Sequence, residues 1–174
     1  MQHLKIFVEL TRLNKPIGFM LLFWPCSWGL ALAYNESQNF NLFLYYLILF
    51  FLGSVLMRSA GCIFNDIVDK DFDKKVQRTK SRPIASGKIT INQSLVYVII
   101  LCLAAFFVLM QFNLFTIVLG MSSMLLAFSY PFMKRITYWP QLFLGITFNW
   151  GIIMAWTSMS NNISPEIIIL YISA

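Results

Sequence analysis

Five apolar stretches, each long enough to cross a bilayer as a helix, constrain this chain more than any other feature. They cover residues 16–34, 40–64, 94–111, 114–132 and 139–158. A helix of about 20 residues spans the roughly 30 Å hydrocarbon core of a membrane. The stretches lack the alternation of a lipid-facing strand, and a helix satisfies its backbone hydrogen bonds internally. The sequence therefore predicts an all-α, multi-span transmembrane bundle with five complete spans.

The composition points to the same class. Only 11% of the 174 residues are charged, against about one quarter in soluble domains, and the mean hydropathy is +0.71. We therefore predict a single integral membrane domain over residues 1–174, with the lipid membrane as its surroundings. No nucleic-acid-reading module accompanies the basic residues, so a nucleic-acid partner is not expected.

The basic residues gather in three segments between the apolar stretches. All of the thirteen Lys and Arg residues except Arg58 lie in them: Lys5, Arg12 and Lys15; Lys70, Lys74, Lys75, Arg78, Lys80, Arg82 and Lys88; Lys134 and Arg135. The positive-inside rule then predicts that the N-terminus and both basic loops face the cytoplasm. Anchoring and attraction to anionic lipids would explain most of these charges without any catalytic role.

A dense acidic cluster, FNDIVDKDFDKK, follows the second apolar stretch. If the helix continues, Asp66, Asp69 and Asp73 share one face, Asn65 lies on its flank and Asp71 points to the far side. Carboxylates at the C-terminal end of a helix repel each other and the helix dipole, and a hard cation such as Mg²⁺ would relieve both effects. The alternative is a solvated acidic loop that nearby lysines neutralise.

Arg58 is the one basic residue inside a predicted span. It lies two turns before Asn65, on nearly the same helical face and deeper in the bilayer. An ionisable side chain there is costly and usually marks a cavity. The alternative is an arginine that extends to the lipid headgroups.

Three segments carry a resemblance to a known family. RSAGCIFNDIVDKDFDKKVQRTKSRPIASGKIT, at residues 58–90, resembles the first aspartate-rich motif, N-D-x-x-D-x-x-x-D, of the UbiA superfamily of membrane prenyltransferases. RLNKPIGFMLLFWPCSWGLALA and YPFMKRITYWPQLFLGITFNWGIIMAW, at residues 12–33 and 130–156, resemble its 4-hydroxybenzoate polyprenyltransferases more narrowly. The resemblance covers nearly the whole chain.

The resemblance implies an activity and its ligands. These are transfer of a polyprenyl group from polyprenyl diphosphate to 4-hydroxybenzoate in ubiquinone biosynthesis, with Mg²⁺ as cofactor. The implied location is a bacterial inner (cytoplasmic) membrane or the mitochondrial inner membrane, with the matrix then in place of the cytoplasm. Neither the length of the prenyl chain nor the oligomeric state follows from the sequence.

The resemblance also implies roles for single residues. The metal-binding positions are Asn65, Asp66, Asp69 and Asp73, of which the three aspartates, with Arg58, form the expected catalytic set. Arg82, Lys134 and Arg135 lie on the same predicted side and are candidates for the diphosphate, because arginine offers a fork of donors to phosphate oxygens. Arg58 could meet the carboxylate of hydroxybenzoate by its position.

Two helix starts bound the remaining features. Thr90 and Gln93 form a predicted capping box, which ends a catalytic loop of about residues 65–90 on the cytoplasmic side. Ser164, Pro165 and Glu166 predict the start of a sixth helix that is too short to cross the membrane before Ala174. Since the family's second aspartate-rich motif is absent, we expect an N-terminal part of a longer enzyme, and its activity alone is left open.

Two other function classes compete with the enzyme. One is a non-catalytic subunit whose sixth helix is completed by a partner chain. The other is a membrane carrier with a cation-attracting acidic cluster, although a carrier needs polar groups near the middle of several spans and these are sparse here.

Overall fold

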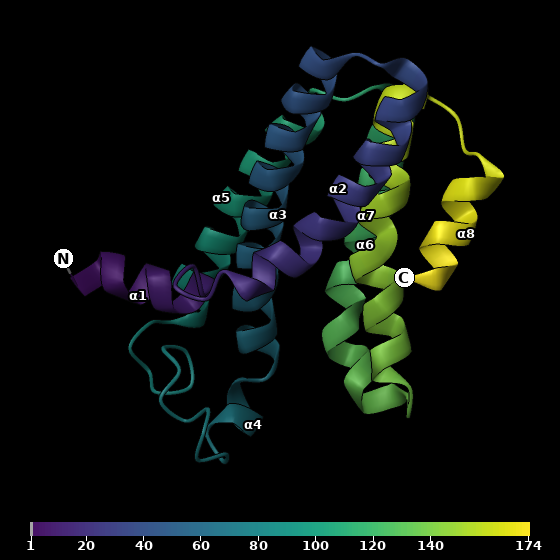
Figure 1. Cartoon of the computed structure of the whole chain (residues 1–174). Helices are drawn as coiled ribbons and strands as arrows, with labels where there is room; N and C mark the ends of the chain where they lie inside the picture. The colour runs from purple at the N-terminus through teal and green to yellow at the C-terminus, as the bar shows by residue number, and fades with distance from the viewer. Residues whose placement is uncertain (1) are drawn as a thin grey trace.

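The computed structural model describes residues 2–174, and only the backbone of Gln2, Lys134 and Arg135. No strand occurs among these residues. The helices are α1 Gln2–Thr11, α2 Ile17–Ser37, α3 Phe40–Val68, α4 Lys70–Asp73, α5 Ile91–Leu109, α6 Leu114–Ile136, α7 Pro140–Ser160 and α8 Pro165–Ser173 (Figure 1).

Five of these helices, α2, α3, α5, α6 and α7, are long and apolar enough to cross a membrane. The predicted all-α bundle with five spans is confirmed. Several helices extend past the apolar stretches: α3 runs to Val68, four residues beyond its stretch, and α5 begins at Ile91, directly after the predicted cap Thr90 and three residues before its stretch. The helices are longer than the apolar stretches because hydropathy falls at the first polar residues, whereas helical hydrogen bonding continues to the next cap or turn.

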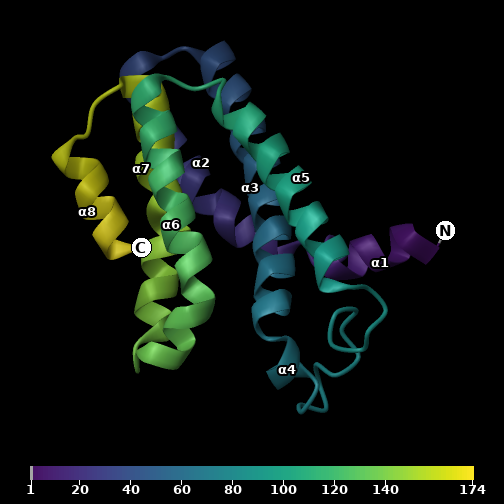
Figure 2. The same cartoon turned by 180° about the vertical axis from the view of Figure 1, so that it is seen from behind.

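The spans are arranged in two antiparallel pairs joined by a slanted helix. α5 packs against α3, α6 packs against α7, and α2 lies against both α3 and α7 (Figures 1 and 2). The α2–α7 contact is close because two glycines face it. A Cβ at Gly29 would clash with the carbonyl oxygen of Ile152, and one at Gly151 would clash with Cys26 Sγ.

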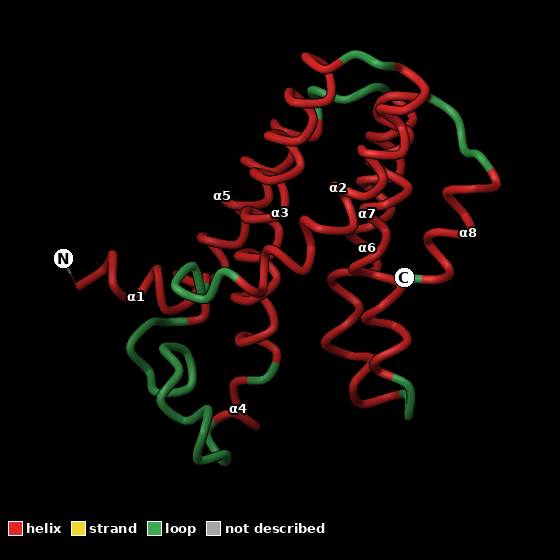
Figure 3. Tube along the Cα trace, in the orientation of Figure 1, coloured by secondary structure: helices red, strands yellow, loops and turns green. Residues whose placement is uncertain are grey.

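The two ends of the bundle differ. We call the end that carries α4 and the long connection 74–90 the loop end, and the opposite end, where α2 joins α3 and α5 joins α6, the far end (Figure 3). α1 runs roughly perpendicular to the spans and projects sideways from the bundle on the side of α3 and α5 (Figures 1 and 2). α8 turns back from the far end alongside α7.

Both predicted helix starts are confirmed. Gln93 N donates to Thr90 Oγ1 at 3.3 Å and Thr90 N donates to Gln93 Oε1 at 3.2 Å, which completes the capping box of α5. Ser164 caps α8, with Pro165 at its first position. The backbone N–H of Glu166 and the Ser164 hydroxyl hydrogen-bond the Glu166 carboxylate and lower its pKa below the usual value.

The connection 74–90 is held down by an apolar core of its own. Ile84, 1% exposed, packs in a buried cluster with Leu10 of α1, Ala60 and Ile63 of α3, and Val98 and Leu101 of α5. Burial of one isoleucine side chain contributes about 2 kcal/mol. The loop is therefore fixed against three helices at the loop end, and this position sets where its polar side chains lie.

Candidate functional site

The aspartate motif lies at the end of α3, and its helix is interrupted. α3 ends at Val68, and Asp69, with φ −87° and ψ 3°, forms a turn before the four residues of α4. The condition that places the three aspartates on one face, a helix that continues through Asp73, is therefore not met without a break. Asp69 N still donates to Asn65 O at 2.9 Å, and Asp73 N donates to Asp69 O at 2.8 Å, so the chain keeps close to helical spacing across the turn.

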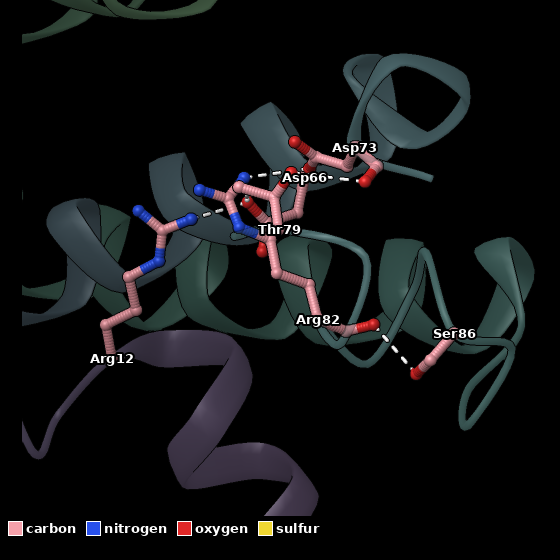
Figure 4. A network of polar contacts seen from close by, with 6 residues as sticks. All are labelled: Arg12, Asp66, Asp73, Thr79, Arg82 and Ser86. Carbon is pink, nitrogen blue, oxygen red and sulfur yellow. Dashed lines mark hydrogen bonds and ion pairs between the residues drawn. The ribbon is translucent and has the colours of Figure 1, made fainter. Parts of the chain in front are cut away.

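Two arginines from distant parts of the chain meet the acidic motif. Arg82 Nη1 donates to Asp66 Oδ1 at 3.1 Å and to Asp73 Oδ2 at 2.8 Å. Arg12 Nη2 donates to the same Asp66 oxygen at 2.6 Å. Figure 4 shows both guanidinium groups directed at Asp66. We call these four residues the arginine–aspartate network.

Burial makes the network strong. The Asp66 side chain is 2% exposed, whereas the two arginine side chains are 28% and 27% exposed. A carboxylate removed from water needs charged partners, and hydrogen bonds between ions are about twice as strong as neutral ones. Asp66 is therefore a fixed acceptor at the loop end, and the two arginines contact it from the more solvent-exposed side.

Arg12 reaches Asp66 because the backbone turns sharply there. Arg12 follows the last residue of α1 and has φ 56°, in the left-handed region where glycine is favoured. A non-glycine residue held in such a conformation costs about 1 to 3 kcal/mol, and the ion pair to Asp66 helps to offset that cost. Sequence reasoning assigned Arg12 to membrane topology and missed this contact, because the partners lie 54 positions apart.

Arg82 is positioned by turns in the loop. Its carbonyl oxygen accepts hydrogen bonds from Ser86 N and Ser86 Oγ, both at 2.8 Å. Thr79 Oγ1 donates to the Asp73 carbonyl oxygen at 3.1 Å, which ties the start of the loop to α4 (Figure 4). The buried Ile84 lies two residues after Arg82. The loop therefore presents Arg82 to the end of α3 without any contribution from a ligand.

The other predicted residues near the motif are less central. Asn65 and Asp69 are half-buried on either side of Asp66. The Asp71 side chain is 87% exposed, and among the described side chains its ion pair is with Lys74 at 3.8 Å, which agrees with the prediction that it points away from the other aspartates. Such an exposed pair contributes little to stability.

Lys134 and Arg135 belong by their backbone to the last turn of α6. Their side chains lie outside the described part of the structure, so their predicted role toward a diphosphate stays a prediction.

Arg58 stands apart from the network, deeper in α3. Its Nε is buried and has no hydrogen-bond partner within the described part of the chain. Its guanidinium carbon lies 6.0 Å from the centre of the Phe148 ring on α7. On α2, a Cβ at position 18 would come within 2.8 Å of Arg58 Nε, so Gly18 leaves room for the guanidinium. An arginine that faces other helices, with a donor to spare, fits a buried anion.

A cavity of about 420 Å³ lies between α2, α3, α5, α6 and α7. Its walls are almost entirely apolar, with hydroxyl groups only from Ser54, Ser123 and Thr147 among the lining residues. No member of the arginine–aspartate network lines it, but Met57, the neighbour of Arg58, does. The charged groups therefore lie at the loop end and the apolar space lies farther inside the bundle.

A comparison with protein families decides the identity of this arrangement. The model of the UbiA prenyltransferase family matches residues 22–174. The chain belongs to the UbiA prenyltransferase family. This confirms the resemblance of the aspartate-rich motif, and the five helices agree with a multi-pass membrane protein.

Curated relatives narrow the likeness within the UbiA family. The chain is 48% identical to the mitochondrial 4-hydroxybenzoate polyprenyltransferase of Arabidopsis thaliana, over 96% of this chain and 41% of the relative. It is 45% identical to the 4-hydroxybenzoate octaprenyltransferase of Hydrogenovibrio crunogenus, over 93% of this chain and 55% of the relative. The chain thus spans about half the length of the curated relatives it matches.

A solved structure supports the fold. An apo UbiA homolog from Aeropyrum pernix K1 superposes with a TM-score of 0.72 at 25% identity, covering 88% of this chain and 57% of that one. The bundle described above is therefore a UbiA-family fold.

The family likeness implies a divalent metal, and the residues present can be tested against it. Within the described side chains, no group of three or more His, Cys, Asp or Glu is arranged to hold a metal ion, so the three motif aspartates do not form a ready cage. Asp66 and Asp73 nevertheless converge on one positively charged nitrogen of Arg82. Two carboxylates that already share a cation suit Mg²⁺, which keeps several waters and takes its other ligands from phosphate. The donor set fits the metal.

Proposed function

We propose that this UbiA-family protein transfers a polyprenyl group from a polyprenyl diphosphate to the ring of 4-hydroxybenzoate, with Mg²⁺, as a step of ubiquinone biosynthesis. One observation carries the proposal: Asp66 and Asp73 converge on a single cation at the loop end of a bundle whose helices line an apolar cavity. A charged head and an apolar tail are the two parts of a prenyl diphosphate. The names of the similar relatives supply the acceptor.

Asp66 and Asp73, with Asn65 and Asp69 beside them, would hold the metal. Bound Mg²⁺ would neutralise negative charge on the departing diphosphate as a Lewis acid. Asp66 is buried on a long helix, so it would fix the position of the ion. Asp73 lies on α4 and would adjust to it.

The arginines at the loop end would bind the diphosphate oxygens. Arg82 and Arg12 already present guanidinium groups at Asp66, next to where the phosphates would lie. Lys134 and Arg135 complete the proposed set. Arginine suits this work because its planar fork donates two parallel hydrogen bonds to phosphate.

Arg58 would bind the carboxylate of 4-hydroxybenzoate. Its buried Nε lacks a partner among the described residues, and a carboxylate would satisfy it. Gly18 and Phe148 shape the space around the guanidinium. The apolar cavity beyond Met57 would bind the prenyl chain. Because lipid is as apolar as the cavity, transfer of the chain from lipid is favourable only through close packing contacts.

The loop end would face the cytoplasm in bacteria or the matrix in mitochondria. The positive residues near α1, in the connection 74–90 and at the end of α6 support this orientation. Relatives are named from both bacteria and mitochondria, which favours an inner membrane.

The test is prenyl transfer by the purified protein in lipid vesicles. Radiolabelled 4-hydroxybenzoate and geranyl diphosphate are supplied with Mg²⁺, and the product is extracted into organic solvent. We expect a labelled prenylated product that disappears with EDTA and returns when Mg²⁺ is added in excess. Absence of product with geranyl and with longer diphosphates would overturn the proposal for this chain.

A further inference from the structure

The network places an arginine where the proposed metal has to go. Arg82 Nη1 lies within 3.1 Å of Asp66 Oδ1 and within 2.8 Å of Asp73 Oδ2, so one nitrogen serves both carboxylates. A cation that bound both oxygens would occupy the same space. The guanidinium and a metal ion that bridges these two oxygens therefore exclude each other.

Charge balance makes this exclusion matter. Asp66 and Asp73 carry two negative charges, and Arg12 and Arg82 carry two positive charges at hydrogen-bond distance. Adding a divalent ion would bring two more positive charges next to the buried Asp66 carboxylate, which two arginines already contact. A metal alone must therefore displace an arginine from its partner, which weakens its binding.

The arginine is the partner that can move. Asp66 is held on α3 and is 2% exposed, whereas Arg82 reaches it from a loop by a long side chain that is 27% exposed. The Arg82 backbone stays fixed by Ser86 and the buried Ile84, so a released guanidinium remains on the same side of the site. A diphosphate bound there would supply the oxygens that the guanidinium loses.

We infer that Arg82 is a built-in competitor of the metal ion, which it excludes from Asp66 and Asp73 until a diphosphate takes over its guanidinium group. The inference rests on the proposed function, whose metal and diphosphate it couples. Binding of metal alone is weak, binding of diphosphate raises the affinity for metal, and by linkage the metal raises the affinity for diphosphate by the same factor. Without bound diphosphate, the site therefore has only a low affinity for the metal ion.

The test is a metal titration without any prenyl transfer. Binding of Mn²⁺, a spectroscopic substitute for Mg²⁺, is followed by electron paramagnetic resonance with and without inorganic pyrophosphate, against a protein-free titration as blank. The proteins are the unmodified chain, Arg82→Gln, Arg82→Lys, and Lys74→Gln as a control. Lys74 lies in the same region and pairs only with the exposed Asp71, so its loss changes the charge equally without touching the network.

Arg82→Gln is expected to have opposite effects on Mn²⁺ binding without pyrophosphate and on the increase in Mn²⁺ affinity that pyrophosphate causes. Arg82→Gln should bind Mn²⁺ alone about tenfold more tightly, because no charge-assisted hydrogen bonds have to be broken. It should lose most of the increase that pyrophosphate gives the unmodified protein. Arg82→Lys, which keeps a positive charge, and Lys74→Gln should stay within about threefold of the unmodified protein in both conditions.

Other results separate the inference from the function beneath it. If Arg82→Gln bound Mn²⁺ alone no better than the unmodified protein, Arg82 would only support the structure, and the inference would be wrong. If the unmodified protein took up no Mn²⁺ even with pyrophosphate, the proposed function itself would fail. Arg12→Gln gives a second approach should Arg82→Gln not fold, with a smaller gain of about threefold, because it removes one donor from Asp66 and leaves Arg82 in place.

Discussion

The loop end and the far end of the bundle each hold a polar network, and the two are built from different groups. At the loop end, Asp66 is paired with Arg12 and Arg82, which are ions. At the far end, Asn113 Nδ2 donates to the carbonyl oxygens of Thr157 and Ser158 at 2.7 Å and 3.1 Å.

The far-end network is closed. Thr116 and Thr157 share a hydroxyl contact of 3.0 Å, and both residues are completely buried. Its acceptors include backbone carbonyl oxygens, whose positions are fixed by α7. A substitution at Asn113 can therefore only remove hydrogen bonds. The loop-end ions can exchange one partner for another of the same charge, such as a metal ion or a phosphate. The comparison indicates that the far-end network holds helices together, whereas the proposed function requires the loop-end network to exchange ligands.

The largest expected effect comes from removing the buried acid of the loop end. Asp66→Ala should lower the rate of prenyl transfer at least about 100-fold, because it removes a proposed metal ligand and leaves Arg12 without its partner. Asp71→Ala is the matched control, since that carboxylate is exposed, and should change the rate less than about twofold. Equal losses in both variants, measured as kcat with 4-hydroxybenzoate, would contradict the assignment of Asp66.

A smaller effect is expected at Arg58, between the two ends. Arg58→Met keeps an unbranched apolar stem and removes the guanidinium with its charge, so the dissociation constant for 4-hydroxybenzoate should rise about tenfold. The dissociation constant for geranyl diphosphate should change less than about threefold, because Arg58 does not belong to the arginine–aspartate network. Calorimetric titration with each ligand gives the ranking, and the reverse ranking would remove the role proposed for Arg58.

The smallest effect is on stability alone, at the far end. Asn113→Ala removes the cap of α6 and two hydrogen bonds to α7, and should cost about 2 kcal/mol in the free energy of unfolding. Asn39→Ala removes only the exposed cap of α3, and should cost about 1 kcal/mol.

In thermal unfolding in detergent, Asn113→Ala should have a lower unfolding temperature than Asn39→Ala. Both variants should keep the affinity of the unmodified protein for Mn²⁺ with pyrophosphate. A lower metal affinity in Asn113→Ala would show that the two networks are not independent.

Features that depend on near neighbours in the chain could be predicted from the sequence. Hydropathy over about 20 residues located the five spans, and the Thr90 and Gln93 pair marked the start of α5 to the residue. The helical period also separated Asp71 from Asp66. The turn at Asp69 was not foreseen, because no glycine or proline marks it.

Features that depend on distant parts of the chain could not be predicted in this way. The contact of Arg12 with Asp66 requires a left-handed backbone at Arg12 and the packing of α1 on α3. The position of Arg82 depends on where Ile84 is buried. The sequence contained one clue, since RLNKPIG starts at Arg12 and belongs to the segments that resemble the family.

The glycine contact between α2 and α7 has a mechanical consequence for the cavity. At Gly29 and Gly151 the two helices meet so closely that the Ile152 backbone and the Cys26 side chain leave no room for a Cβ. The cavity lining also includes Met121 and Met124 of α6, whose unbranched side chains rearrange at little cost. The cavity thus has a stiff part at Gly151 and a compliant part at α6, and the proposed prenyl chains of different length would be accommodated beside the methionines of α6.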